Sequence, residues 1–156
     1  MLYLDTSALV KCYFKEEAGS DAVIARATAP DQELFTSVLT FAEMQSVMAR
    51  KHREKQINLA ELSKLREVFE RDWAILVSAV ELTLQTMAAL PGLVQQFRLK
   101  AGDAVQLSTA IWLKDNIEAG GDNRISKILE FGVADRELGE IARQCGLIVF
   151  NPEDEL

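Results

Sequence analysis

Short apolar runs of strand length alternate in this chain with longer segments of helical period, and no other feature restricts the possible folds as strongly. Side chains on one face of a strand recur at every second position, whereas those on one face of a helix recur about every 3.6 positions. Parallel strands need long crossover connections, which are usually helices. We therefore predict an α/β fold with three layers, in which helices flank a mostly parallel central sheet of about five short strands.

The expected elements can be placed by these periods and by the turn residues between them. Strands are predicted at residues 2–4, 33–37, 75–77, within 128–133 and at 147–150. Helices are predicted from about residue 7, from 19–21, over about 40–53 and 59–73, in segments up to 99 interrupted at Pro91-Gly92, from 103, and over 135–145. Residues 118–123 are predicted to form an exposed loop, because they combine glycines with turn-forming side chains.

The length of 156 residues is usual for one domain, so we expect a single domain over residues 1–156. Acidic residues outnumber basic ones by 24 to 17, giving a formal charge of -7. That sign does not suit a simple nucleic-acid coat protein, so an RNA partner requires a local basic patch or a cation.

We expect a cytoplasmic protein without a membrane partner. The N-terminus lacks the basic region and apolar run of a secretory signal, and no apolar stretch approaches the roughly 20 residues that span a bilayer. Cys12, Cys145 and the single His52 are too scattered to form a zinc site, and we expect the two cysteines to be buried as small apolar side chains.

Four acidic residues occupy similar positions: Asp5, Glu43, Asp103 and Asp135 each lie at or just inside the start of a predicted helix. Each could simply cap its helix, because Asp is a preferred N-cap and Thr40 to Glu43 has the spacing of a capping box. In a parallel sheet, however, the carboxyl ends of all strands lie on one edge, so side chains at strand-to-helix junctions can converge there.

Capping alone would not justify bringing these acids together. Two carboxylates within ~5 Å repel by roughly 3 kcal/mol at an effective dielectric of ~20, several times the ~1 kcal/mol gained from a cap. A divalent cation relieves this repulsion, and a site made only of carboxylates favours Mg²⁺ or Mn²⁺ over zinc. Such a cation suits phosphodiester cleavage by activated water, although residue types alone leave open which acid orients the water.

Four segments, in order along the chain, resemble the motifs of PIN-domain ribonucleases. The third segment, in which Gly102-Asp103-Ala104 opens an apolar helix, is the most similar. The resemblance implies that the four acids are catalytic metal ligands and that nearby hydroxyls help to orient them. The segments are Leu4 to Leu9, Ser37 to Glu43, Leu99 to Ala110 and Phe131 to Leu138, and the hydroxyls are those of Thr6, Ser7 and Ser37.

The fourth segment departs from the family pattern in two ways. The family often has a hydroxyl residue two positions before the last acid, where this chain has Val133, so a hydrogen bond to water or phosphate is expected to be missing. The interval between Asp103 and Asp135 is also long and contains Asp122, which competes with Asp135 as the fourth acid. The flanking residues favour Asp135.

Among PIN proteins, a chain of this length with its first motif at the N-terminus is most similar to VapC-type toxins. This resemblance implies cleavage of specific RNAs such as tRNA, inhibition by a VapB-like antitoxin, and a homodimer. The apolar helix positions, including Tyr13, Phe14, Met44 and Met48, could form a groove for an antitoxin helix, but core packing is the stronger interpretation. We also interpret Trp73 and Trp112 as core or interface residues before base-stacking ones.

A basic cluster follows the second acid on the same predicted helix. Arg50, Lys51, Arg53 and Lys55 could contact RNA phosphates, or could simply form a solvated helix end favoured by the helix dipole. His52 lies within this cluster, and we interpret it as a surface residue.

Two other functions fit parts of the sequence. A phosphatase of the haloacid-dehalogenase type also begins with an Asp after its first strand, but it requires a second Asp where this chain has Ser7. A PIN-like module that binds RNA or protein without cleavage is compatible with Val133, and metal binding without cleavage would identify it.

Overall fold

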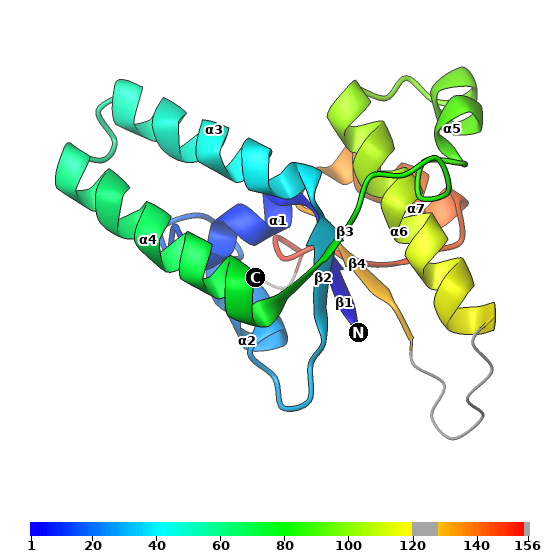
Figure 1. The fold of residues 1–156 in the computed structure, drawn as a ribbon, viewed down its shortest axis with the longest axis horizontal. Helices are drawn as coiled ribbons and strands as arrows, with labels where there is room; N and C mark the ends of the chain where they lie inside the picture. The colour runs from blue at the N-terminus through cyan, green and yellow to red at the C-terminus, as the bar shows by residue number, and fades with distance from the viewer. Residues whose placement is uncertain (120–127, 155–156) are drawn as a thin grey trace.

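The computed structural model describes residues 1–119 and 128–154. Its sheet has five strands, all parallel, in the order β3-β2-β1-β4-β5. The strands are β1 (Leu2–Leu4), β2 (Leu34–Ser37), β3 (Val77–Val80), β4 (Glu130–Gly132) and β5 (Ile148–Phe150). The parallel α/β class predicted from the sequence is confirmed, and β1 lies at the centre of the sheet (Figure 1).

The central strand divides the core into two clusters. Leu2 and Leu4 belong to the first, which we call cluster one, and Tyr3 belongs to the second, cluster two, as expected for side chains that alternate across a strand. All three are fully buried, because helices cover both faces of the sheet. The fold is therefore the three-layer arrangement that the alternating apolar pattern predicts.

The N-terminal half of the chain covers the first face (Figure 1). Cluster one contains Met44, Met48 and Phe14, so these residues pack in the core. Trp73 packs on Phe41 and Phe69 at the edge of this cluster. The covering elements are α1 (Thr6–Leu9), a 3-10 helix (Val10–Cys12), α2 (Ser20–Ala27), α3 (Leu39–Arg53) and α4 (Leu59–Leu76).

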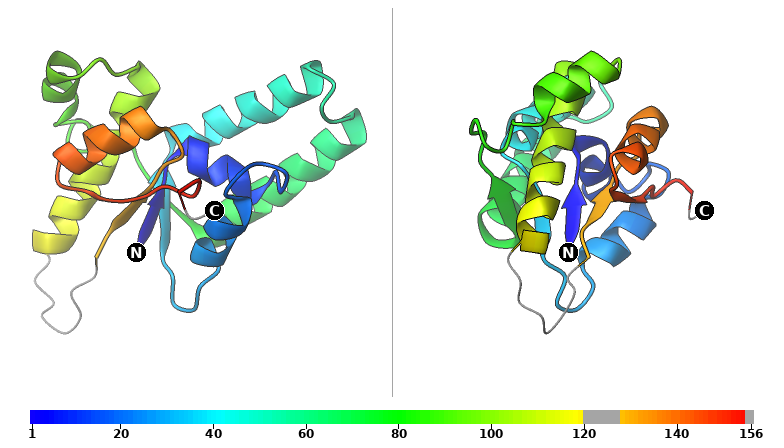
Figure 2. Two further views of the ribbon diagram at one scale, coloured as in Figure 1. Left: turned by 180° about the vertical axis from the view of Figure 1, so that it is seen from behind. Right: turned by 90° about the vertical axis from the view of Figure 1, so that its right-hand side faces the viewer.

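The second face is covered by α5 (Leu90–Gln96), α6 (Ala101–Ala119) and α7 (Arg136–Gln144). Leu107, Phe131 and Leu138 lie in cluster two, and Trp112 packs against it. The views from behind and from the side in Figure 2 show the same division between the two groups of helices. No helix within residues 1–119 and 128–154 is long and apolar enough to cross a bilayer.

Several element boundaries differ from those expected. The third strand is at Val77–Val80 and not at 75–77, because α4 continues without a Gly or Pro through Ile75 and Leu76. Pro91 and Gly92 were expected to interrupt a helix, but they lie in the first turn of α5, where proline is tolerated because its missing N–H has no partner to lose. The remaining strands overlap their expected ranges.

Part of the predicted 118–123 loop lies outside the described residues. α6 is described up to Ala119, and β4 begins at Glu130. Asp122, the competing fourth acid, is not among the described residues.

Candidate active site

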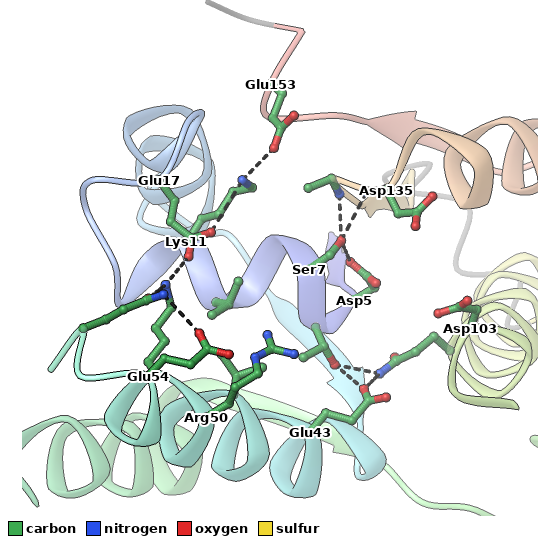
Figure 3. Close-up of a pocket in the computed structure, with 17 residues that line it drawn as sticks. Asp5, Ser7, Lys11, Glu17, Glu43, Arg50, Glu54, Asp103, Asp135 and Glu153 are labelled. Carbon is green, nitrogen blue, oxygen red and sulfur yellow. Dashed lines mark hydrogen bonds and ion pairs between the residues drawn. The ribbon is translucent and has the colours of Figure 1, made fainter. Parts of the chain in front are cut away.

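The four acidic residues singled out in the sequence lie at the carboxyl edge of the sheet. Asp5 directly follows β1, Glu43 lies one turn into α3 after β2, Asp103 lies in the first turn of α6, and Asp135 follows β4 and precedes α7. All four line one pocket of about 530 Å³. Figure 3 shows them around this pocket, approaching it from different elements. Three strand-to-helix junctions and the start of α6 therefore bring these acids to one pocket.

Asp5 is the most deeply placed of the four. Its residue is 5% exposed, and its Oδ1 accepts hydrogen bonds from the Ser7 hydroxyl (2.6 Å) and the Ala8 amide (3.1 Å). It is the N-cap of α1, so the capping interpretation is correct for this residue. Burial raises the pKa of Asp5 to about 7, the hydrogen bonds from Ser7 and Ala8 oppose this rise, and the Glu43 carboxylate adds to it.

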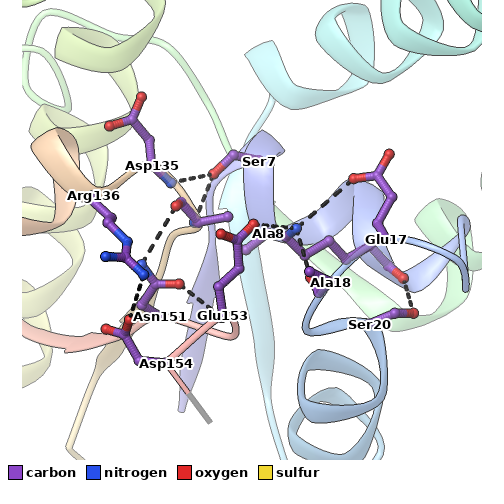
Figure 4. Close-up of polar contacts among 12 residues, drawn as sticks. Ser7, Ala8, Glu17, Ala18, Ser20, Asp135, Arg136, Asn151, Glu153 and Asp154 are labelled. Carbon is purple, nitrogen blue, oxygen red and sulfur yellow. Dashed lines mark hydrogen bonds and ion pairs between the residues drawn. The ribbon is translucent and has the colours of Figure 1, made fainter. Parts of the chain in front are cut away.

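Ser7 connects the ends of the two neighbouring strands β1 and β4. Its hydroxyl donates to Asp5 and accepts from the backbone amides of Ala134 (2.9 Å) and Asp135 (3.4 Å). One side chain therefore fixes the orientation of Asp5 and the position of the segment that carries Asp135. Figure 3 shows Ser7 beside Asp5, and the close-up in Figure 4 shows its contact with the Asp135 amide.

Glu43 is held by side chains from two other elements. Its Oε2 accepts hydrogen bonds from the Thr6 hydroxyl and from Nε2 of Gln106 (2.9 Å). The capping-box interpretation of Thr40 to Glu43 is wrong, because the N-cap residue of α3 is Val38 and makes no side-chain cap. The Thr40 hydroxyl instead contacts Gln106 (2.8 Å).

Gln106 is buried between these groups and was not identified from the sequence. Its Nε2 lies 2.9, 2.8 and 3.2 Å from Glu43, Thr40 and Thr6, respectively. The Tyr3 hydroxyl donates to its Oε1 (2.8 Å), which fixes the amide so that its nitrogen faces Glu43. Burial and the nearby Asp5 carboxylate hold the pKa of Tyr3 well above its usual value, so this hydroxyl remains a donor. The same stretch of α6 also contains Ser108 and Thr109, so the polar character of Gln106 did not single it out.

Asp103 approaches the pocket from the opposite side. Burial raises its pKa, Lys100 opposes the rise, and the carboxylates of Asp135 and Glu43 add to it. The preceding Gly102 makes room for Glu43, since a Cβ at this position would lie 2.7 Å from Glu43 Oε1. The glycine therefore lets the Glu43 side chain reach the start of α6.

Asp135 is exposed and is the N-cap of α7, where its Oδ1 accepts from the Leu138 amide (3.0 Å). It is therefore a helix cap that also faces the pocket. Val133, the residue that departs from the family pattern, is fully buried in cluster two and does not line the pocket. The hydroxyl contact near Asp135 comes from Ser7.

The predicted hydroxyls and basic residues divide into two groups. Thr6 and Ser7 contact the acids, whereas the Ser37 hydroxyl accepts from the Leu39 amide (3.2 Å) at the start of α3. Arg50 and Lys51 line the pocket, whereas Arg53 and Lys55 lie outside its lining. Four further charged residues line the pocket but were missed by sequence reasoning, since no family motif includes them: Lys11, Glu17, Glu54 and Glu153.

The donor set fits a hard divalent cation by its chemistry. All four candidate ligands are carboxylates, and three pairs of them interact electrostatically: Asp5 with Glu43, and Asp103 with both Glu43 and Asp135. Within the described ranges, no three acid, His or Cys side chains are already arranged around one point. Gln106 holds Glu43 through Oε2 and the Leu138 amide holds Asp135 through Oδ1, so the second oxygen of each carboxylate lies outside these hydrogen bonds.

A family model described as the PIN domain matches residues 2–128, which is most of the chain. The chain belongs to the PIN domain family. The matched residues of this PIN domain include Asp5, Glu43 and Asp103, and the match ends before Asp135. No match to a curated protein was found.

PIN domains have a nuclease-type fold and are generally metal-dependent hydrolases. The four-acid pocket of this PIN domain has the composition that such chemistry requires. Membership of this family is incompatible with the haloacid-dehalogenase alternative. The all-parallel sheet and its two helical layers are consistent with the PIN fold.

Proposed function

We propose that this PIN domain is a Mg²⁺- or Mn²⁺-dependent endoribonuclease. The observation that carries the proposal is the meeting of Asp5, Glu43, Asp103 and Asp135 in one pocket at the carboxyl edge of the sheet. Acids that only capped helices would not need to share a pocket, because like charges at close range destabilise each other. Burial is the largest cause of the raised pKa values of Asp5 and Asp103, and the neighbouring carboxylates add to the rise.

Asp5 and Asp103 are the primary ligands in this proposal, with Glu43 and Asp135 completing the site. When bound, the divalent cation supplies activation of water and stabilisation of negative charge on phosphate oxygens. Ser7 holds Asp5 in position, and Thr6 and Gln106 hold Glu43. The carboxylates also require the cation for a second reason, since an acidic pocket repels a phosphodiester in its absence.

We further propose a VapC-type role, which rests on the resemblance of the sequence motifs to this branch. In this role the substrate is a specific RNA such as a tRNA, and the protein is the toxin of a type II toxin-antitoxin pair. A VapB-like antitoxin and a second copy of this chain are then its partners, and the cytoplasm is its location. One catalytic domain over residues 1–156 suffices for this activity.

The test is cleavage of total cellular RNA by the purified protein in Mg²⁺, Mn²⁺ or EDTA. We expect discrete RNA fragments with either cation, none with EDTA, and none with Asp103→Asn, which also controls for contaminating nuclease. A folded protein that binds Mn²⁺ but cuts no RNA would contradict the proposal and favour the PIN-like binding module. Cleavage that persists in Asp103→Asn would show that the activity does not come from this pocket.

A further inference from the structure

Three basic residues line the active-site pocket beside the acids: Lys11, Arg50 and Lys51. Lys11 is 4% exposed, and its Nζ donates to the Ala18 carbonyl (2.8 Å) and to Glu153 (2.8 Å), with Glu17 at 3.9 Å. Figure 3 shows the Lys11 amine between the carboxylates of Glu17 and Glu153. Its charge is therefore neutralised within the protein and is not available to an incoming phosphate.

Lys51 is also engaged. Its Nζ forms an ion pair with Glu17 (2.7 Å) and lies 4.5 Å above the centre of the Phe14 ring. The side chain is only 16% exposed, so the ring and the carboxylate enclose much of its charge. A phosphate would have to displace Glu17 to reach it.

Arg50 differs from both lysines. It is exposed, and within residues 1–119 and 128–154 its guanidinium forms no ion pair, although it lines the pocket. Figure 3 shows the guanidinium pointing into the pocket from α3. Glu43, Val47 and Arg50 line the pocket from successive turns of this helix, and seven residues at a rise of about 1.5 Å place Arg50 ~10 Å along the helix from Glu43.

We propose that Arg50 binds an RNA backbone phosphate adjacent to the one that is cleaved, an inference that rests on the proposed ribonuclease function. The cleaved phosphate must lie at the carboxylates, and Arg50 is about two helical turns from Glu43. The guanidinium is always charged and can bind two phosphate oxygens at once. Within the basic cluster at residues 50–55, Arg50 therefore makes the phosphate contact. Arg53 and Lys55 do not make it, because they do not line the pocket.

The first test measures RNA binding without cleavage, using Asp103→Asn as the background. The probe is a fluorescein-labelled single-stranded RNA of mixed sequence, and its anisotropy is titrated in Mg²⁺ buffer over a series of salt concentrations. Adding Arg50→Ala is expected to raise Kd about tenfold and to reduce the slope of log Kd against log salt by about 0.7, the value for one phosphate contact with a single strand. Arg50→Lys is expected to restore the slope but only part of the affinity.

Arg53→Ala is the matched control, because it removes the same charge from the end of the same helix outside the pocket. It is expected to change Kd less than twofold. Equal weakening by Arg50→Ala and Arg53→Ala would overturn the proposal, since it would indicate diffuse attraction by the whole cluster. An unchanged Kd with Arg50→Ala would overturn it as well.

The second test separates an adjacent phosphate from the cleaved one. In otherwise unaltered protein, Arg50→Ala is expected to raise KM for RNA cleavage about tenfold and to change kcat less than twofold. A fall in kcat with unchanged KM would overturn the proposal by placing Arg50 at the cleaved phosphate. If the unaltered protein neither binds nor cuts RNA, the proposed function itself fails, whereas normal cutting by Arg50→Ala refutes only the role of Arg50.

Discussion

Asp5 shows at the scale of a single residue how the site and the stability of the fold conflict. Its carboxylate is buried, is weakly repelled by the Glu43 carboxylate, and is stabilised by hydrogen bonds from Ser7 and Ala8. A raised pKa means that the folded protein holds the proton more tightly than the unfolded chain does. The ionised form that would bind a cation is thus the form that destabilises the cation-free fold.

We predict that Asp5→Asn stabilises the cation-free protein in a pH-dependent way. The stabilisation that protonated Asp5 provides is complete below its usual pKa of 3.8 and is lost as the pH rises to about 7. Asn resembles the protonated acid at every pH, so the gain should be small at pH ~4 and about 1–4 kcal/mol at pH ~8. Urea unfolding in EDTA measures it, and an equal effect at both pH values would contradict this explanation.

Gly102 offers a second test at the same scale. In Gly102→Ala, the new Cβ would lie 2.7 Å from Glu43 Oε1 and would push this carboxylate away, whereas alanine favours the helix by about 1 kcal/mol. We expect RNA cleavage to fall about tenfold or more while the free energy of unfolding is maintained or rises. Gly92→Ala in α5 is the control, because its Cβ meets no atom within 4 Å. Equal activity of the two variants would show that the position of Glu43 does not matter.

At the scale of elements, each acid is placed by the start of a helix, and this placement was largely predictable. The strand and helix periods gave the correct parallel class, and turn residues located the starts of α2 and α7. The starts of β3 and α5 were misplaced, because an apolar helix end resembles a strand and because Pro91-Gly92 can either break or begin a helix. Gln106 could not be predicted as a partner of Glu43, since their contact joins α3 to α6 and depends on how the two helices pack.

Asp135 allows the two roles of a helix-start acid to be separated. Asn and Asp are equally good N-caps, so Asp135→Asn should leave stability unchanged, whereas Asp135→Ala should cost about 1 kcal/mol. If Asp135 is also a ligand, both variants should lower cleavage at limiting Mg²⁺ by a similar factor, with partial recovery at high Mg²⁺. Thermal unfolding measures the capping role, and cleavage assays measure the role as a ligand. Full activity in Asp135→Asn would show that this residue only caps the helix.

At the scale of the whole molecule, the strand order decides which junctions meet. β1 lies between β2 and β4, so Asp5 is at the centre, with Glu43 and Asp135 carried by the neighbouring strand ends. The C-terminal segment closes this side of the pocket: Glu153 reaches Lys11, and Pro152 packs so closely on Gly19 that a Cβ there would lie 2.5 Å from the Pro152 carbonyl oxygen. These contacts join distant parts of the sequence, so no local pattern could have predicted them.

Direct binding of Mn²⁺, followed by loss of the electron paramagnetic resonance signal of the free ion, is the measurement that addresses the four-acid site most directly. We predict that the unaltered protein binds Mn²⁺ at neutral pH, and that Asp5→Asn and Asp103→Asn each weaken binding at least tenfold while remaining folded. Gly92→Ala should bind as the unaltered protein does. A signal that stays at its free value with the folded protein, or equal binding by Asp103→Asn, would contradict the assignment of these acids as a metal site.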